Sequence, residues 1–117
     1  VAGTCLRPRI HLHDGPPENS CRPSADVLFR SAARMFGPRC LAVVMTGMGR
    51  DGLLGTRQVV QSGGQALAQG RESCTVWGMP RHVVEEGLAR EVPLALLAEA
   101  IQSRVARPPE GDGPWPI

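Results

Sequence analysis

Hydrophobic and polar positions along the chain recur with two different periods, which predict its helices and strands. Residues 25–36, just after Pro23, and residues 93–105 carry apolar side chains at helical spacing. A third helix is predicted from Asp51 to about Ser62, because glycines 63 and 64 stop the pattern there. Residues 81–86 add a helical turn or two.

Shorter apolar or alternating runs between these helices predict strands. Five segments qualify: residues 9–13, 41–46, 65–69, 75–77 and 91–92. Strands that alternate with helices predict an α/β fold with a doubly wound, mainly parallel sheet. Parallel sheets need cover on both faces and the chain supplies few strands, so we expect part of such a domain.

Composition narrows the classes of function. The chain has 117 residues and is 42% hydrophobic, which suffices for one domain with a core. Two Phe, two Trp and no Tyr leave few surfaces on which bases could stack, and the net charge of +2 comes with scattered arginines, so we expect no nucleic-acid partner. No apolar run approaches the ~18 residues of a membrane span, so we expect no membrane insertion.

The four cysteines lie far apart, at positions 5, 21, 40 and 74, without a C-x-x-C pair. We therefore expect reduced thiols in a cytoplasmic protein rather than a disulfide framework. His11 and His13 would complete a zinc ligand set with them, but the spacing does not match structural zinc sites. Small buried thiols and a solvated histidine pair are the preferred interpretation.

The glycine-rich segment 47–52 follows the apolar strand 41–46 and opens a helix, where ligands gather in open α/β sheets. It fits the dinucleotide pattern G-x-G-x-x-G, with Glu72 twenty residues beyond Gly52. Against this, Asp51 would place a negative charge in the phosphate cradle. In addition, a whole helix precedes a turn that normally comes first in such domains.

A second interpretation makes Asp51 a catalytic residue. A carboxylate at a helix N-terminus stays ionised, and it can orient a histidine and support the imidazolium that forms during acyl transfer. The flanking glycines let a backbone N–H serve as an oxyanion donor. The residues alone leave a third interpretation open, in which Asp51 only caps its own helix.

Three segments in this order resemble the C-terminal half of the catalytic domain of the CheB-type protein-glutamate methylesterases of bacterial chemotaxis. They are Ile10 to Asn19 running into Arg22 to Phe29, Thr46 to Gly52, and Ala68 to Pro80. We therefore predict residues 1–106 as the C-terminal part of such a domain. Residues 107–117, rich in Pro and Gly, are predicted to be a disordered tail.

The resemblance implies hydrolysis of glutamyl methyl esters on methyl-accepting chemoreceptors, and deamidation of glutamines, by a Ser-His-Asp triad on a doubly wound α/β domain. It assigns the triad acid to Asp51 and an oxyanion-hole backbone N–H to Met48, with no metal or organic cofactor. Many members carry an N-terminal receiver domain whose phosphorylation relieves inhibition. Cys21 stands where these proteins commonly have a histidine.

In that family the nucleophilic serine and the histidine lie earlier in the domain. Ser62 precedes two glycines at a predicted helix end, and the other serines and histidines (Ser24, Ser73, His11, His13 and His82) fit first-turn, loop or solvated positions. None is expected to replace the missing groups, so the isolated chain is expected to be inactive. A second hypothesis is therefore a non-catalytic, truncated or split product that exposes apolar surface until a partner supplies the other half.

Overall fold

The computed structural model describes residues 8–19 and 21–106. In chain order the elements are α1 (Ala25–Phe36), a 3-10 turn (Gly37–Arg39), β1 (Leu41–Val44), α2 (Leu53–Gln61), β2 (Gln65–Gln69), a second 3-10 turn (Arg71–Ser73), α3 (Met79–Glu85), β3 (Arg90–Val92) and α4 (Leu94–Val105). Among the residues described, no helix is long and apolar enough to cross a membrane.

The three strands form one parallel sheet in the order β1-β2-β3. β1 pairs with β2 from Leu41 opposite Gln65 to Val44 opposite Ala68, and β2 pairs with β3 through Gln69 opposite Val92. Because all three strands run the same way, their carboxyl ends meet at one edge, where the loops that follow β1 and β2 lie side by side. The predicted α/β class with a parallel sheet is confirmed.

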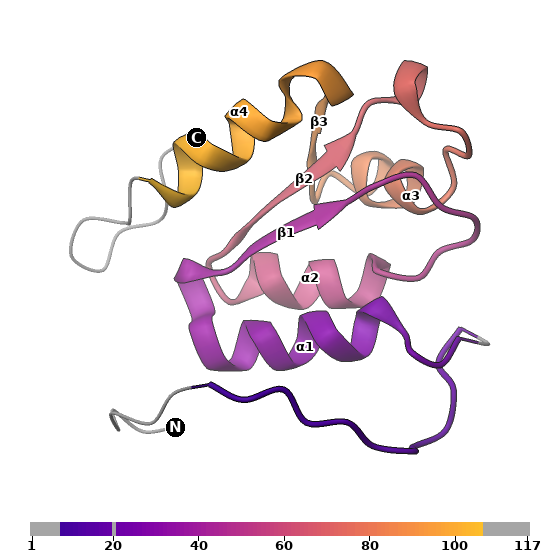
Figure 1. Cartoon of the computed structure of the whole chain (residues 1–117), viewed down its shortest axis with the longest axis vertical. Helices are drawn as coiled ribbons and strands as arrows, with labels where there is room; N and C mark the ends of the chain where they lie inside the picture. The colour runs from indigo at the N-terminus through magenta and orange to yellow at the C-terminus, as the bar shows by residue number, and fades with distance from the viewer. Residues whose placement is uncertain (1–7, 20, 107–117) are drawn as a thin grey trace.

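Helices cover both faces of this sheet (Figure 1). On the face of α1, α2 and α3, Ala42 and Val44 of β1 are buried in two apolar clusters. On the other face, Leu41 and Val43 pack with β2, β3 and α4. Since alternate side chains of a strand point to opposite faces, β1 serves two cores at once, as a doubly wound sheet requires.

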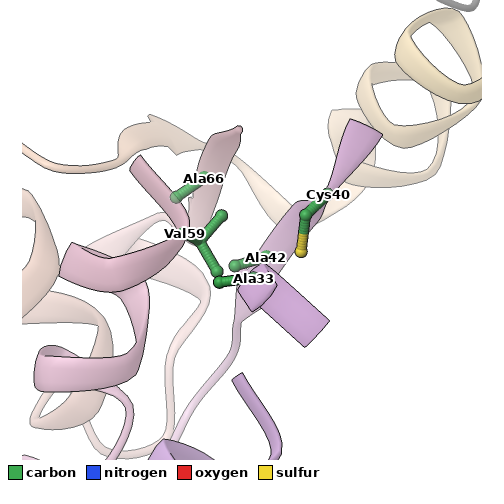
Figure 2. Close-up of a cluster of buried hydrophobic side chains, with 5 residues drawn as sticks. All are labelled: Ala33, Cys40, Ala42, Val59 and Ala66. Atoms are coloured by element: carbon green, nitrogen blue, oxygen red, sulfur yellow. The ribbon is translucent and has the colours of Figure 1, made fainter. Parts of the chain in front are cut away.

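The core beneath α1 and α2 consists of small side chains. Figure 2 shows Ala33 of α1 and Val59 of α2 beside Ala42 and Ala66 of the two neighbouring strands, with Cys40 at the beginning of β1. Such small residues let the helices and the sheet approach closely. This contact places α1 and α2 against β1 and β2.

Several predicted elements are confirmed and two are wrong. The helix over 25–36, the strand over 65–69, the edge strand at 91–92 and the C-terminal helix appear as predicted, and α2 begins at Leu53, two residues after the expected Asp51. Residues 9–13 form no strand: this segment runs extended past α1 (Figure 1), and Ile10 and Leu12 are 91% and 87% exposed. A strand needs a neighbour to bond to, and none of the described residues supplies one.

The segment 75–77 also fails to form a strand. It makes a single bridge, between Trp77 and Gly47 of the loop after β1. The predicted tail at residues 107–117 lies outside the described residues.

Candidate functional site

Asp51 lies in the loop between β1 and α2, and only 8% of its surface is exposed. Its carboxylate accepts hydrogen bonds from the beginning of α1: from the Ser24 hydroxyl at 2.7 Å, the Ala25 N–H at 2.7 Å and the Asp26 N–H at 3.1 Å. From its own side it accepts the Gly52 N–H at 3.0 Å. The interpretation in which Asp51 only caps its own helix is therefore wrong, because most of its donors belong to the neighbouring helix.

Asp26 makes the reverse contact. Its fully buried carboxylate accepts the N–H of Gly55, in the first turn of α2, at 2.6 Å. Helix N-termini leave N–H groups without partners and carry a partial positive charge, so a carboxylate at each is favourable. The two helices thus cap each other, each through an aspartate.

A third side chain joins the two carboxylates. The side-chain amide of Asn19 donates to Asp26 Oδ2 at 2.7 Å and to Asp51 Oδ1 at 3.3 Å. Asn19 and Asp26 were not predicted as part of a site. One signal was available, because Asp26 lies three and seven positions before Phe29 and Ala33, on the face of the helix that is otherwise apolar.

The environment of Asp51 favours its ionised form. Burial by itself would raise the pKa of the Asp51 carboxyl. The hydrogen bonds from Ala25, Ser24, Asp26 and Asn19 outweigh burial, and the pKa lies below its ordinary value. Asp51 is consequently a carboxylate at neutral pH.

The two oxygens of this carboxylate are unequally used. Oδ1 accepts from Asn19, Ser24, Asp26 and Gly52, whereas Oδ2 accepts from Ala25. A carboxylate offers about four lone-pair sites, about two on each oxygen. Oδ2 therefore retains capacity for one further donor, such as the N–H of an imidazole.

The glycine loop before Asp51 is braced by the segment that follows β2. Gly47 donates to the Val76 carbonyl at 3.0 Å, and its own carbonyl accepts the N–H groups of Gly78 at 3.1 Å and Met79 at 2.9 Å. A Cβ at Gly78 would lie 2.8 Å from the Gly47 carbonyl oxygen, so the two segments cross at glycine. The crossing ties the glycine loop to the segment that follows β2.

Met48 stands on the exposed side of this loop, with 81% of its surface accessible. Across the described part of the chain, no hydrogen bond uses its backbone N–H. Gly49 beside it has a φ of +87°, a backbone that favours glycine. The Met48 N–H thus has no hydrogen-bond acceptor among the described residues, as the predicted oxyanion donor requires.

Gln69 connects the loop to the end of β2. The residue is 2% exposed; its amide oxygen accepts the Thr46 N–H at 2.8 Å, and its amide nitrogen donates to the Ser73 carbonyl at 2.9 Å. Gln69 was predicted as the last residue of a strand, with no role in the site. Its side chain satisfies backbone groups of both loops at the carboxyl edge of the sheet.

The remaining sequence candidates supply no base or nucleophile to this site. Ser24 does reach Asp51, as a buried hydroxyl donor at the N-cap position of α1. Ser62 ends α2, Ser73 ends the second 3-10 turn, and the rings of His11 and His13 stack on each other in the extended segment. No described serine and histidine are paired by a hydrogen bond, so the site as described holds an acid without a base or nucleophile.

The dinucleotide interpretation does not fit this geometry. The N-terminus of α2, which would face a pyrophosphate, instead faces the carboxylates of Asp26 and Asp51. Both would repel a phosphate from the place where its charge is normally stabilised. Among the described residues, no cluster of three or more His, Cys, Asp or Glu side chains is arranged to hold a metal ion.

Comparison with known proteins finds relatives in one family. A family model described as CheB methylesterase matches residues 2–101. A protein-glutamate methylesterase/protein-glutamine glutaminase from a Nocardioides species is 52% identical over 100 residues, which cover 85% of this chain and 27% of that protein. The protein-glutamate methylesterase FrzG of Myxococcus xanthus is 46% identical over 98 residues, covering 83% of this chain and 29% of its own length.

Among solved structures, the CheB methylesterase catalytic domain of Thermotoga maritima superimposes with a TM-score of 0.73 at 36% identity. The match covers 74% of this chain and 47% of that domain. The chain thus spans little more than a quarter of its curated relatives and about half of a solved catalytic domain.

Proposed function

The chain belongs to the CheB methylesterase family, and we propose that it contributes the triad acid and the oxyanion loop of a protein-glutamate methylesterase and glutaminase. The observation that carries this proposal is the unequal use of the Asp51 oxygens. A buried, ionised carboxylate with Oδ2 open to one more donor is what a triad acid needs in order to orient a histidine.

In this proposal the rest of the domain supplies a serine and a histidine. The serine Oγ attacks the carbonyl carbon of a glutamyl methyl ester, and the histidine takes the serine proton. The oxyanion accepts the Met48 N–H, and Asp51 accepts the histidine N–H and stabilises the imidazolium. The histidine then gives its proton to the leaving methanol, and a water molecule repeats the sequence to release the serine and a glutamate. Glutamine follows the same route with ammonia as the leaving group.

Family membership supports methyl-accepting chemoreceptors as the substrates. It likewise supports a cytoplasmic place in phosphorelay signalling, with a receiver domain in a longer chain. The contribution of this chain is restricted to the carboxyl edge of the sheet, where Met48 and Asp51 share one loop. Neither metal nor organic cofactor is needed for this chemistry.

The outer edge of β1 supports attachment of the remainder of the domain at this strand. Within the described residues β1 pairs with β2 alone, and its sequence Leu-Ala-Val-Val carries no charge or proline. Natural sheets protect a free edge with such residues, so this edge is suited to pairing with another strand. The same observation favours the second candidate, a non-catalytic half that becomes an enzyme only when this edge is paired.

The proposal is tested in a completed domain, in which this chain follows the N-terminal portion of the T. maritima catalytic domain. The assay measures methanol release from a methylated receptor peptide. Asp51→Asn is expected to lower kcat by a factor on the order of 10⁴, as loss of a triad acid does. The exposed Asp14→Asn is the matched control. A loss smaller than about tenfold in Asp51→Asn would reduce Asp51 to a helix cap.

A further inference from the structure

Asn19 is held in a fixed place before α1. Its backbone has a φ of 54°, in the left-handed region that asparagine tolerates better than most residues. Backbone hydrogen bonds between Glu18 and Cys21, at 3.0 and 2.8 Å, close the turn around it. The Glu18 carboxylate also accepts two hydrogen bonds from Arg30 of α1, at 2.9 and 2.6 Å, so the turn is tied to the helix.

The Asn19 amide separates two buried negative charges. Asp26 and Asp51 both accept hydrogen bonds from the same nitrogen, so their carboxylates lie close together. Like charges repel strongly where water is excluded. The two amide hydrogens, one directed at each carboxylate, offset this repulsion and keep Asp51 beside the N-terminus of α1.

We propose that Asn19, anchored by Asp26, is a positioning residue for Asp51. Its amide occupies Oδ1 and leaves Oδ2 as the oxygen to which the catalytic histidine donates. This inference rests on the proposed function, because it assigns Asn19 a role in the same reaction. In this role Asn19 acts through the Asp51 carboxylate, to which its amide donates.

Two substitutions separate positioning from folding of the turn. Asn19→Gly keeps the left-handed backbone, which glycine adopts readily, and removes only the amide. Asp26→Asn keeps an oxygen for the Gly55 N–H but turns an NH₂ group toward the Asn19 amide. The Asn19 amide then reverses and directs its oxygen at Asp51. Both variants disturb the same contact from different residues.

The experiment measures kcat, KM and thermal melting in the completed domain. Asn19→Gly is expected to lower kcat by about tenfold to a hundredfold, as small misplacements of catalytic groups do, with KM near that of the parent. Its melting temperature is expected to fall because two hydrogen bonds to buried carboxylates are lost, so the assay is run below the melting transition of the variant. Asp14→Gly, at an exposed position five residues before Asn19, is the control. In an Asp51→Asn background Asn19→Gly is expected to have no further effect, because its partner is already lost. A kcat within twofold of the parent, or an equal loss in both backgrounds, overturns the inference.

A readout independent of activity separates this inference from the proposed function. If the completed domain with the natural residues releases no methanol, the proposed function fails by itself. The Asp51 carboxyl is then titrated by ¹³C NMR in the chain as it stands. Asn19→Gly is expected to raise the pKa of Asp51, because a donor to the ionised form is removed. An unchanged titration overturns the role of the Asn19 amide.

Discussion

Gly55 of α2 and Phe29 of α1 meet where a methyl group would not fit. A Cβ at Gly55 would lie 2.5 Å from the Phe29 Cβ and 3.1 Å from the backbone of Asp26. The helices therefore touch at the turn where Asp26 accepts the Gly55 N–H. The closeness of the two helices and the cross-capping of their ends are one feature of the structure.

Gly55→Ala is expected to destabilise the protein, although alanine favours a helix over glycine by about 1 kcal/mol. The added methyl group must push α1 from α2 at a close-packed contact, which typically costs about 1–3 kcal/mol. Urea denaturation measures the free energy of unfolding. Gln58→Ala, on the exposed side of the same helix, is the control. A Gly55→Ala protein as stable as the parent would contradict the closeness of the two helices.

Gln69→Leu is expected to lower stability by about 1–3 kcal/mol, because the Thr46 N–H and the Ser73 carbonyl lose a buried partner. In the completed domain it should also lower kcat, since the loop that carries Met48 begins at Thr46. Gln102→Leu, at an exposed position of α4, provides the comparison for denaturation and kinetics. Equal stability of the two variants would show that Gln69 does not brace the loop.

Asp51 is expected to make stability depend on pH in the acid range. Its pKa is lowered in the folded protein, whereas an unfolded aspartate titrates near 3.9. The stabilisation is therefore complete above about pH 4 and is lost as the pH falls through the folded-state pKa. Asp51→Asn cannot titrate, so its deficit in unfolding free energy should shrink between neutral pH and about pH 2. A deficit that stays constant over this range would contradict the charged hydrogen bonds.

Cys40 is expected to resist thiol reagents in the folded protein. Its side chain is buried in the cluster of Figure 2, and burial raises the pKa of the Cys40 thiol. Because the thiolate is the reactive form, alkylation should wait for unfolding. Iodoacetamide labelling followed by mass spectrometry compares Cys40 with the half-exposed Cys21. Equal labelling rates in native buffer would contradict the burial of Cys40.

The sequence predicts most of the fold because each helix and strand has its own local signal. Residues 25–36 show helical spacing and residues 41–46 form a mostly apolar run, and the structure has α1 and β1 there. The buried strand predicted over 41–46 ends at Val44, and Met45 and Thr46 are exposed. Residues 9–13 alternate as a strand does, but alternation only makes a strand possible. Whether one forms depends on a neighbour distant in sequence, and none lies within the described residues.

The site is less predictable, because its contacts join residues far apart in the chain. The special position of Asp51 follows from the strand, the glycines and the helix around it. Its hydrogen bonds to Ser24, Ala25 and Asp26 join residues that are 25 to 27 positions apart in the sequence. They depend on the close approach of α1 and α2 at Gly55. Local patterns carry no information about such a crossing.

Within the part of the chain that the structure describes, every donor to Asp51 comes from residues 19–52, and the loop of Met48 is braced by Gln69 and by residues 76–79. Under the proposed function, the acid and the oxyanion loop are therefore held by contacts within this chain. A substitution in the rest of the domain would then leave the hydrogen bonds around Asp51 intact, even where it alters the access of a substrate to the site.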